Sequence, residues 1–257
     1  VTLRTKENIK ILKDKGAICV ENDNGGNVIK EIDVLLSVRG GFGSARLLDK
    51  INYPLIKKHF KPFFGFSDMT ALQNALWKKA KIPSYTGFLV CFALEKMSEK
   101  YKKSVYACLK NQPQKMKIKK INSGCAKGRL LGGNLVSFLS LAGTPYFPNL
   151  KDSILLLEEV KEAPFHIDRM LNQLKQMGVF KEIKGLIFGD MSAKLSLQEK
   201  KAIEKIILSY SKELPYPVCI LKEYSHEKPE VVLPIGGMVK LDADKGILTL
   251  DKITKIN

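Results

Sequence analysis

Short apolar segments typical of β-strands alternate with amphipathic segments typical of α-helices along most of the chain. The alternation is clearest where the apolar run 62–66 leads directly into a helix that the pattern predicts from Asp68 to about Lys79. Because strands that alternate with helices pair mainly in parallel, the pattern favours an α/β sheet. Upstream, it predicts a helix over 5–15 and strands over 17–20 and 32–38.

The second half repeats the alternation and then changes character. Its tail, from about 230 to 251, is interrupted at glycines and favours antiparallel strands. Between the halves, residues 95–123 are rich in lysine and show no clear period, which is typical of a connection between domains. We therefore predict an N-terminal domain over 1–105, a linker over 106–125 and a C-terminal domain over 126–257. The elements predicted in the second half are strands over 153–158 and 185–188 and helices over 134–142, 167–177 and 196–211.

The chain carries 43 basic and 26 acidic residues, a formal net charge of +17. Such a charge attracts polyanions. Only five of the basic residues are arginine, however, and arginine is the residue that recognises bases and phosphates with two parallel hydrogen bonds. We therefore expect a solvated lysine surface and no specific nucleic-acid site, with a polyanion-binding protein as an alternative.

The apolar runs and the cysteines exclude several classes of protein. The longest apolar run, 87–94, is shorter than the roughly 20 residues of a membrane helix, so we expect no membrane span. The five cysteines lack a C-x-x-C pair, which argues against a zinc site and favours a reducing compartment. With no signal sequence visible, the expected location is the cytoplasm. No metal or organic cofactor is expected.

Ser67 is the first candidate for catalysis. It lies between the predicted strand 62–66 and the helix that begins at Asp68, the geometry of a nucleophile elbow. There the N–H of Asp68 can serve as one donor of an oxyanion hole, beside a helix N-terminus that favours negative charge. A serine is also a common N-cap, and a strand–Ser–Asp–helix sequence needs no catalysis.

A serine nucleophile needs a base, and the chain offers three histidines. His59 lies in a cationic stretch, and His166 lies at the start of a predicted helix. His226 follows a strand in a polar loop, where active-site residues tend to gather, so position favours it. Glu158 ends an apolar strand and is the candidate third member, although an exposed acidic turn formed with Glu159 and Glu162 is an equal alternative.

Two glycine-rich turns complete the list of local features. The segment from Arg39 to Gly43 follows a strand but lacks the spacing of a nucleotide-binding loop. Its backbone N–H groups, at Gly40 and Gly41, can still form a nest for an oxyanion. Gly132-Gly133 precedes a predicted helix and by itself is only structural.

Seven motifs follow one another in order over about residues 35–240. They are Arg39-Gly40-Gly41-Phe42-Gly43-Ser44, Gly65-Phe66-Ser67-Asp68-Met69-Thr70-Ala71-Leu72, Gly132-Gly133-Asn134-Leu135, Gly143-Thr144-Pro145-Tyr146, Leu157-Glu158-Glu159, Ile167-Asp168-Arg169-Met170-Leu171, and Ser225-His226 followed by Leu233-Pro234-Ile235-Gly236. Each motif is weak alone, but the ordered set resembles the LD-carboxypeptidase family of serine peptidases. These enzymes are also called muramoyltetrapeptide carboxypeptidases, and the family includes microcin-immunity relatives.

The resemblance implies a catalytic triad of Ser67, His226 and Glu158, with the serine on the N-terminal domain and the other two on the C-terminal domain. It also implies a Rossmann-like, mostly parallel N-terminal domain, a C-terminal α/β domain with antiparallel strands at its end, and a homodimer. The implied substrate is a murein tetrapeptide that loses its terminal D-alanine during cell-wall recycling or remodelling. Ser225 and Glu159 depart from the pattern, because the family usually has Gly and Asp there.

Two alternatives belong to other functional classes. A microcin-immunity-type hydrolase of peptidyl-nucleotide conjugates would share the triad and use an aromatic side chain to stack on the base. Trp77, the only tryptophan, lies at an apolar position of the predicted helix after Ser67 and is therefore predicted to lie in the core instead. A lysine-rich polyanion-binding protein would instead lose affinity steeply with salt, independently of Ser67.

Overall fold

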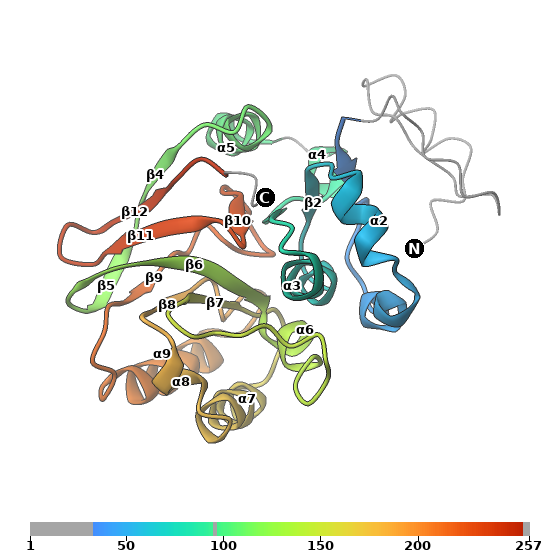
Figure 1. Cartoon of the computed structure of the whole chain (residues 1–257). Coiled ribbons are helices and arrows are strands. Elements are labelled where there is room, and N and C mark those ends of the chain that lie inside the picture. Colours follow the sequence, from blue (N-terminus) through green and yellow to red (C-terminus); the bar gives the residue numbers. More distant parts are fainter. Residues whose placement is uncertain (1–32, 95–96, 254–257) are drawn as a thin grey trace.

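The computed structural model describes residues 33–94 and 97–253, in which helices surround two β-sheets (Figure 1). The smaller sheet has four strands in the order β1-β2-β3-β10. Its first three strands are parallel, and β10 joins β3 in antiparallel orientation. The strands of this sheet are β1 (Leu35–Leu36), β2 (Phe63–Gly65), β3 (Ser84–Thr86) and β10 (Leu233–Ile235).

The larger sheet has eight strands in the order β4-β12-β11-β6-β7-β8-β9-β5. Strands β6 to β9 are parallel, whereas the flanking strands are antiparallel to their neighbours. The predicted α/β fold, with antiparallel strands near the end of the chain, is therefore confirmed. The strands are β4 (Gln114–Lys117), β5 (Lys119–Asn122), β6 (Cys125–Asn134), β7 (Ile154–Glu158), β8 (Gly185–Phe188), β9 (Val218–Ile220), β11 (Met238–Asp242) and β12 (Ile247–Leu250).

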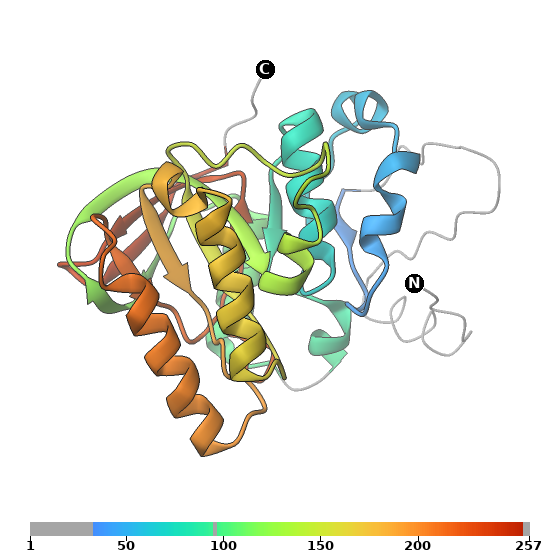
Figure 2. The same cartoon turned by 90° about the horizontal axis from the view of Figure 1, so that it is seen from below.

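Helices α7 and α9 lie side by side along one face of the larger sheet, and α3 lies between the two sheets (Figures 1 and 2). Among the described residues, no helix combines the length and apolarity that crossing a bilayer requires. The helices are η1 (Ser44–Lys50, a 3-10 helix), α2 (Tyr53–Lys58), α3 (Met69–Ala80), α4 (Val90–Leu94), α5 (Glu99–Leu109), α6 (Leu135–Leu139), α7 (Pro164–Gln176), α8 (Val179–Glu182) and α9 (Leu197–Ser211).

One apolar core extends from the larger sheet into α3. Every residue of β7 is buried, and Trp77 on α3 belongs to the same cluster. The guanidinium carbon of Arg129 lies 4.7 Å from the centre of the Trp77 ring. A Cβ added to Gly236 would lie 2.3 Å from that ring, so the indole has no room to move. Trp77 is a core residue, as predicted.

The structure corrects some of the expected boundaries. Within the described part of the predicted strand 32–38, Leu35–Leu36 pair with β2, and the Ser37 N–H also donates to the Phe64 carbonyl at 2.9 Å. The carbonyls of Ser37 and Val38 accept hydrogen bonds from the start of α4 instead. Residues 95–123, in which the sequence shows no period, contain α5, β4 and β5. The segments 5–15 and 17–20 lie outside the described residues. The domain boundaries stay a prediction, and β10 lies in the smaller sheet although the C-terminal domain was predicted to contain it.

Helix α3 is attached to the end of β6 by buried polar contacts. The Asn74 side chain donates to the carbonyl of Gly132 at 2.9 Å and accepts from the N–H of the same residue at 3.0 Å. Gly133 allows this approach, because a Cβ there would lie 2.6 Å from Thr70 Oγ1 on α3. A Cβ on Gly132 would instead lie 2.1 Å from the Leu156 carbonyl oxygen on β7, so the second glycine lets the neighbouring strand lie close.

We predict that Asn74→Ala lowers the free energy of unfolding by about 3 kcal/mol, because it leaves the buried N–H and carbonyl of Gly132 without side-chain partners. Urea denaturation followed by circular dichroism measures the change. The matched control is Asn172→Ala on α7, where the asparagine is exposed and makes no side-chain hydrogen bond to the described residues. Equal stability of the two variants would contradict the prediction.

Candidate active site

Ser67 lies on a sharp turn between β2 and α3. Its φ angle is 62°, in the left-handed region that residues other than glycine rarely adopt. Helix α3 begins two residues later, and its first turn is closed by a hydrogen bond from the Thr70 N–H to the Ser67 carbonyl at 2.9 Å. The predicted elbow geometry is therefore present in the backbone.

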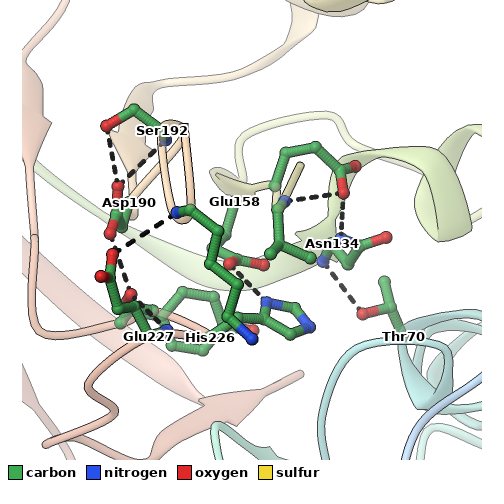
Figure 3. Close-up of polar contacts among 12 residues, drawn as sticks. Thr70, Asn134, Glu158, Asp190, Ser192, His226 and Glu227 are labelled. Carbon is green, nitrogen blue, oxygen red and sulfur yellow. Dashed lines mark hydrogen bonds and ion pairs between the residues drawn. The ribbon is translucent and has the colours of Figure 1, made fainter. Parts of the chain in front are cut away.

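Glu158 lies at the carboxyl end of β7 and is fully buried. Its register partner on β6 is Asn134, whose N–H donates to Thr70 Oγ1 at 3.0 Å. Since Thr70 lies in the first turn after Ser67, this contact ties the serine turn to the strand pair that carries the carboxylate. Figure 3 shows Thr70, Asn134 and Glu158 together.

His226 is in direct contact with Glu158. Its Nδ1 lies 2.6 Å from Glu158 Oε1 (Figure 3), and the imidazole side chain is only 13% exposed. The imidazole also lies over Phe66, with ring centres 4.3 Å apart, which brings it next to the residue that precedes Ser67. The structure thus brings together the two predicted C-terminal site residues and places them beside the serine turn.

Burial dominates the electrostatics of this pair. Desolvation raises the pKa of Glu158 from 4.5 to about 7, although the hydrogen bond and the charge of His226 oppose the shift. Glu159 and Asp190 raise it further, because their negative charges disfavour ionisation of Glu158. The Glu158 carboxyl therefore exchanges its proton near neutral pH.

Two buried atoms of the pair make no hydrogen bond with the residues that the structure describes. They are Oε2 of Glu158 and Nε2 of His226. Among the described residues, no hydrogen bond joins the Ser67 hydroxyl to the imidazole of His226. Catalytic hydrogen bonds are often long before substrate binds. Nε2 is therefore free to accept a proton from a group that enters the site.

The loop from Arg39 to Gly43 packs against the serine. A Cβ added to Gly40 would lie 2.8 Å from the Ser67 Cβ, so only glycine fits without displacement. Asp68 holds the end of this loop, because its carboxylate accepts from the Ser44 N–H at 2.9 Å and its carbonyl accepts from the Ser44 hydroxyl. In the described residues, no acceptor contacts the N–H groups of Asp68, Gly40 or Gly41. These groups are the candidate oxyanion donors.

The alternative of an exposed acidic turn is wrong for Glu158 and Glu159, which are both buried. Glu159 accepts hydrogen bonds from the Asn134 side chain and from the N–H groups of Val136 and Val160, at 2.8 to 2.9 Å. Burial nevertheless raises the pKa of its carboxyl. The other histidines lie apart from this pair: His59 is exposed, and His166 contacts Glu162 at 2.8 Å.

Sequence reasoning did not single out Asp190, which follows β8. Its Oδ2 accepts from the Ser225 hydroxyl at 2.9 Å, and its Oδ1 accepts from the N–H and hydroxyl of Ser192 (Figure 3). Its position at the carboxyl end of a buried strand, like that of Glu158, was the one available signal. Over the described ranges, no cluster of three His, Cys, Asp or Glu side chains is arranged to hold a metal ion.

The raised pKa of Glu158 predicts a specific pH dependence of stability. Between about pH 4.5 and 7 the unfolded chain has released this proton while the folded chain still holds it, so the free energy of unfolding falls as the pH rises through that window. Glu158→Gln removes the titration, and we expect a flatter profile. Urea denaturation of both proteins at pH 5, 6 and 7 measures the difference, and parallel profiles would argue against the raised pKa.

Comparisons with known proteins place this chain in a family. The models of the LD-carboxypeptidase N-terminal and C-terminal domains match residues 28–87 and 127–241. A putative carboxypeptidase of Treponema pallidum is 30% identical over 86% of this chain and 73% of its own length. The muramoyltetrapeptide carboxypeptidase structure from Oxalobacter formigenes is 27% identical with a TM-score of 0.79, covering 88% of this chain and 80% of that one. An MccF-like protein from Bacillus anthracis is 28% identical with a TM-score of 0.76, over 86% of this chain and 77% of that one. On this evidence the chain belongs to the LD-carboxypeptidase family of peptidases.

Proposed function

We propose that this protein is a serine carboxypeptidase that removes the terminal D-alanine of murein tetrapeptides, with Ser67, His226 and Glu158 as its catalytic triad. The observation that carries the proposal is the buried contact between Glu158 and His226 beside the left-handed turn at Ser67. The similarity to a muramoyltetrapeptide carboxypeptidase supports the substrate class.

In the proposed reaction, Nε2 of His226 accepts the proton of the Ser67 hydroxyl, and Ser67 Oγ attacks the carbonyl carbon of the scissile bond. Glu158 keeps the other imidazole nitrogen protonated and stabilises the imidazolium that forms. His226 then gives its proton to the leaving amine of D-alanine, which leaves an acyl-enzyme. Water then attacks the acyl carbon as the imidazole takes its proton, and the imidazolium gives that proton to Ser67 Oγ as the bond to the shortened peptide breaks.

The negative oxygen of each tetrahedral intermediate needs hydrogen-bond donors. The N–H of Asp68 and those of the Gly40–Gly41 segment are the proposed donors, because they lie next to Ser67 without acceptors among the described residues. One such donor is often worth about 3 kcal/mol in the transition state. The contacts of Asp68 with Ser44 support this role, since they hold the glycine loop against the serine turn.

Two parts of the proposal rest on the family resemblance, namely the homodimer and the use of the reaction in cell-wall recycling or remodelling. The cytoplasmic location rests on the cysteines, whose pattern favours a reducing compartment. The net charge of +17 suits an anionic murein peptide.

Hydrolysis of a peptidyl-nucleotide conjugate is the second candidate, and the similarity to an MccF-like protein favours it. A base-stacking aromatic side chain is the feature that this activity would need. Trp77 does not suit that role, because it is 6% exposed and packs between Arg129 and Gly236. Trp77 thus gives this candidate no support, and the murein reaction is placed first on the similarity to a muramoyltetrapeptide carboxypeptidase.

We predict that the protein removes one D-alanine from a murein tetrapeptide and that Ser67→Ala abolishes the cleavage. Mass spectrometry of the peptide after incubation measures the loss. The control is Ser209→Ala, which changes an exposed serine on α9 and should cleave normally. Full activity of Ser67→Ala would rule out this nucleophile, and cleavage only of a peptidyl-nucleotide would favour the second candidate.

Gly40→Ala should lower kcat by about 100-fold in a protein that still folds. The new methyl group would overlap the Ser67 side chain, and either the nucleophile or the glycine loop must then move from its position. Steady-state kinetics measure kcat, and thermal unfolding checks the fold. Wild-type kcat in the folded variant would remove Gly40 from the proposed site.

A further inference from the structure

We propose that Asp190 and Ser225 are positioning residues that hold the imidazole of His226 against Glu158. This inference rests on the proposed function, since it assigns the residues that orient its general base. The two side chains are joined by a hydrogen bond of 2.9 Å from the Ser225 hydroxyl to Asp190 Oδ2.

His226 lies in the segment between β9 and β10, which has no regular secondary structure. A side chain on such a segment keeps one orientation only if its neighbours are fixed, because loop residues otherwise retain backbone freedom. The Ser225 hydroxyl supplies that constraint. It donates to Asp190 and accepts from the Glu227 N–H at 3.0 Å. The residues on both sides of His226, Ser225 and Glu227, are therefore connected to the Asp190 carboxylate.

Asp190 connects the same loop to the strand end that carries Glu158. Its N–H donates to the Tyr224 carbonyl at 2.9 Å, and its carbonyl accepts from the Glu159 N–H at 3.4 Å. Through Ser225 and Glu159, Asp190 therefore contacts the residue before His226 and the residue after Glu158. Asp190 thereby sets the separation of the two members of the pair.

The surroundings leave little room for another arrangement. A Cβ on Gly189 would lie 2.7 Å from the Tyr224 carbonyl oxygen and 3.0 Å from the Glu158 Cβ. Tyr224 is fully buried, and its hydroxyl bonds to Thr86 Oγ1 at 2.8 Å. The loop is thus held at Tyr224 by packing and at Ser225 by the Asp190 carboxylate. Ser225 is itself 2% exposed, so water does not replace its partner.

The charge of Asp190 also acts on the pair. Three carboxylates lie together here, and both Glu159 and Asp190 raise the pKa of Glu158. The phenol of Tyr224 also faces the pair, and its own pKa is raised by burial and by Glu158. Replacing Asp190 by asparagine keeps its shape and removes its charge, which should move the titration midpoint of the Glu158–His226 pair to lower pH.

The test compares Ser225→Ala with Ser192→Ala. Both changes remove a hydroxyl that donates to Asp190, but only Ser225 adjoins His226. We expect Ser225→Ala to lower kcat on murein tetrapeptide by about 10- to 100-fold with little change in KM, and Ser192→Ala to stay within about twofold of wild type. Equal kcat for Ser225→Ala and wild type would overturn the proposal.

A second measurement separates this inference from the proposed function. The chain has three histidines, so the imidazole signals in a nuclear magnetic resonance spectrum can be assigned with His226→Gln. We expect Ser225→Ala to shift the His226 signal, Ser192→Ala to leave it unchanged and Asp190→Asn to lower the pH at which protonation of Glu158 changes that signal. These shifts in a protein that cleaves no tetrapeptide would support the positioning role and reject the substrate. If Ser225→Ala does not fold, Asp190→Asn decides, and an unmoved His226 signal together with wild-type kcat would overturn the proposal.

Discussion

The attachment of α3 to β6 is the constraint on which the site depends. Ser67 lies on the turn after β2 of the smaller sheet and Glu158 ends β7 of the larger one, so their relative position is set where the two sheets meet. Asn74 joins the helix to the backbone of Gly132, and Thr70 joins it to Asn134, the register partner of Glu158. All of these polar groups are buried, where an unpaired donor or acceptor costs about 1 to 3 kcal/mol. Sliding of the helix along the strand would break several of these bonds at once.

The order of strands and helices in the second half could be predicted from the sequence because hydrophobic periodicity is a local property. Strand β8 and helix α9 lie within a residue of their predicted bounds, and Ser196 caps α9 in a capping box with Glu199. Pairing between distant segments could not be predicted in this way. Nothing in the sequence of β5 indicates that β9 is its partner, and nothing in β10 indicates the smaller sheet. The sequence of 95–123 did not predict α5, β4 and β5, because elements at a solvated edge need few apolar residues and therefore show no clear hydrophobic period.

The candidate site shows the same difference between local sequence signals, which could be read, and long-range contacts, which could not. Ser67, Glu158 and His226 could be singled out because each has a reactive side chain at a telling position: a strand–helix junction, a strand end and a loop. Their roles in catalysis stay a prediction. The contacts of Asp190 and Glu159 could not be predicted, because they depend on which groups the fold brings to these carboxylates. Asn74 is a further example, since an asparagine in the middle of a helix carries no signal of a partner on β6.

The position of β10 has a consequence for the order of folding during synthesis. The smaller sheet, which carries the serine turn, is closed along β3 by a strand that the ribosome makes almost 150 residues later. A nascent chain that has emerged only as far as the linker therefore lacks this strand, and β3 has an unpaired edge. During synthesis, the smaller sheet can therefore be completed only after the loop that carries His226 has left the ribosome, because this loop lies just before β10 in the chain. The turn at Ser67 and the loop that carries His226 therefore reach their final arrangement at nearly the same stage of synthesis.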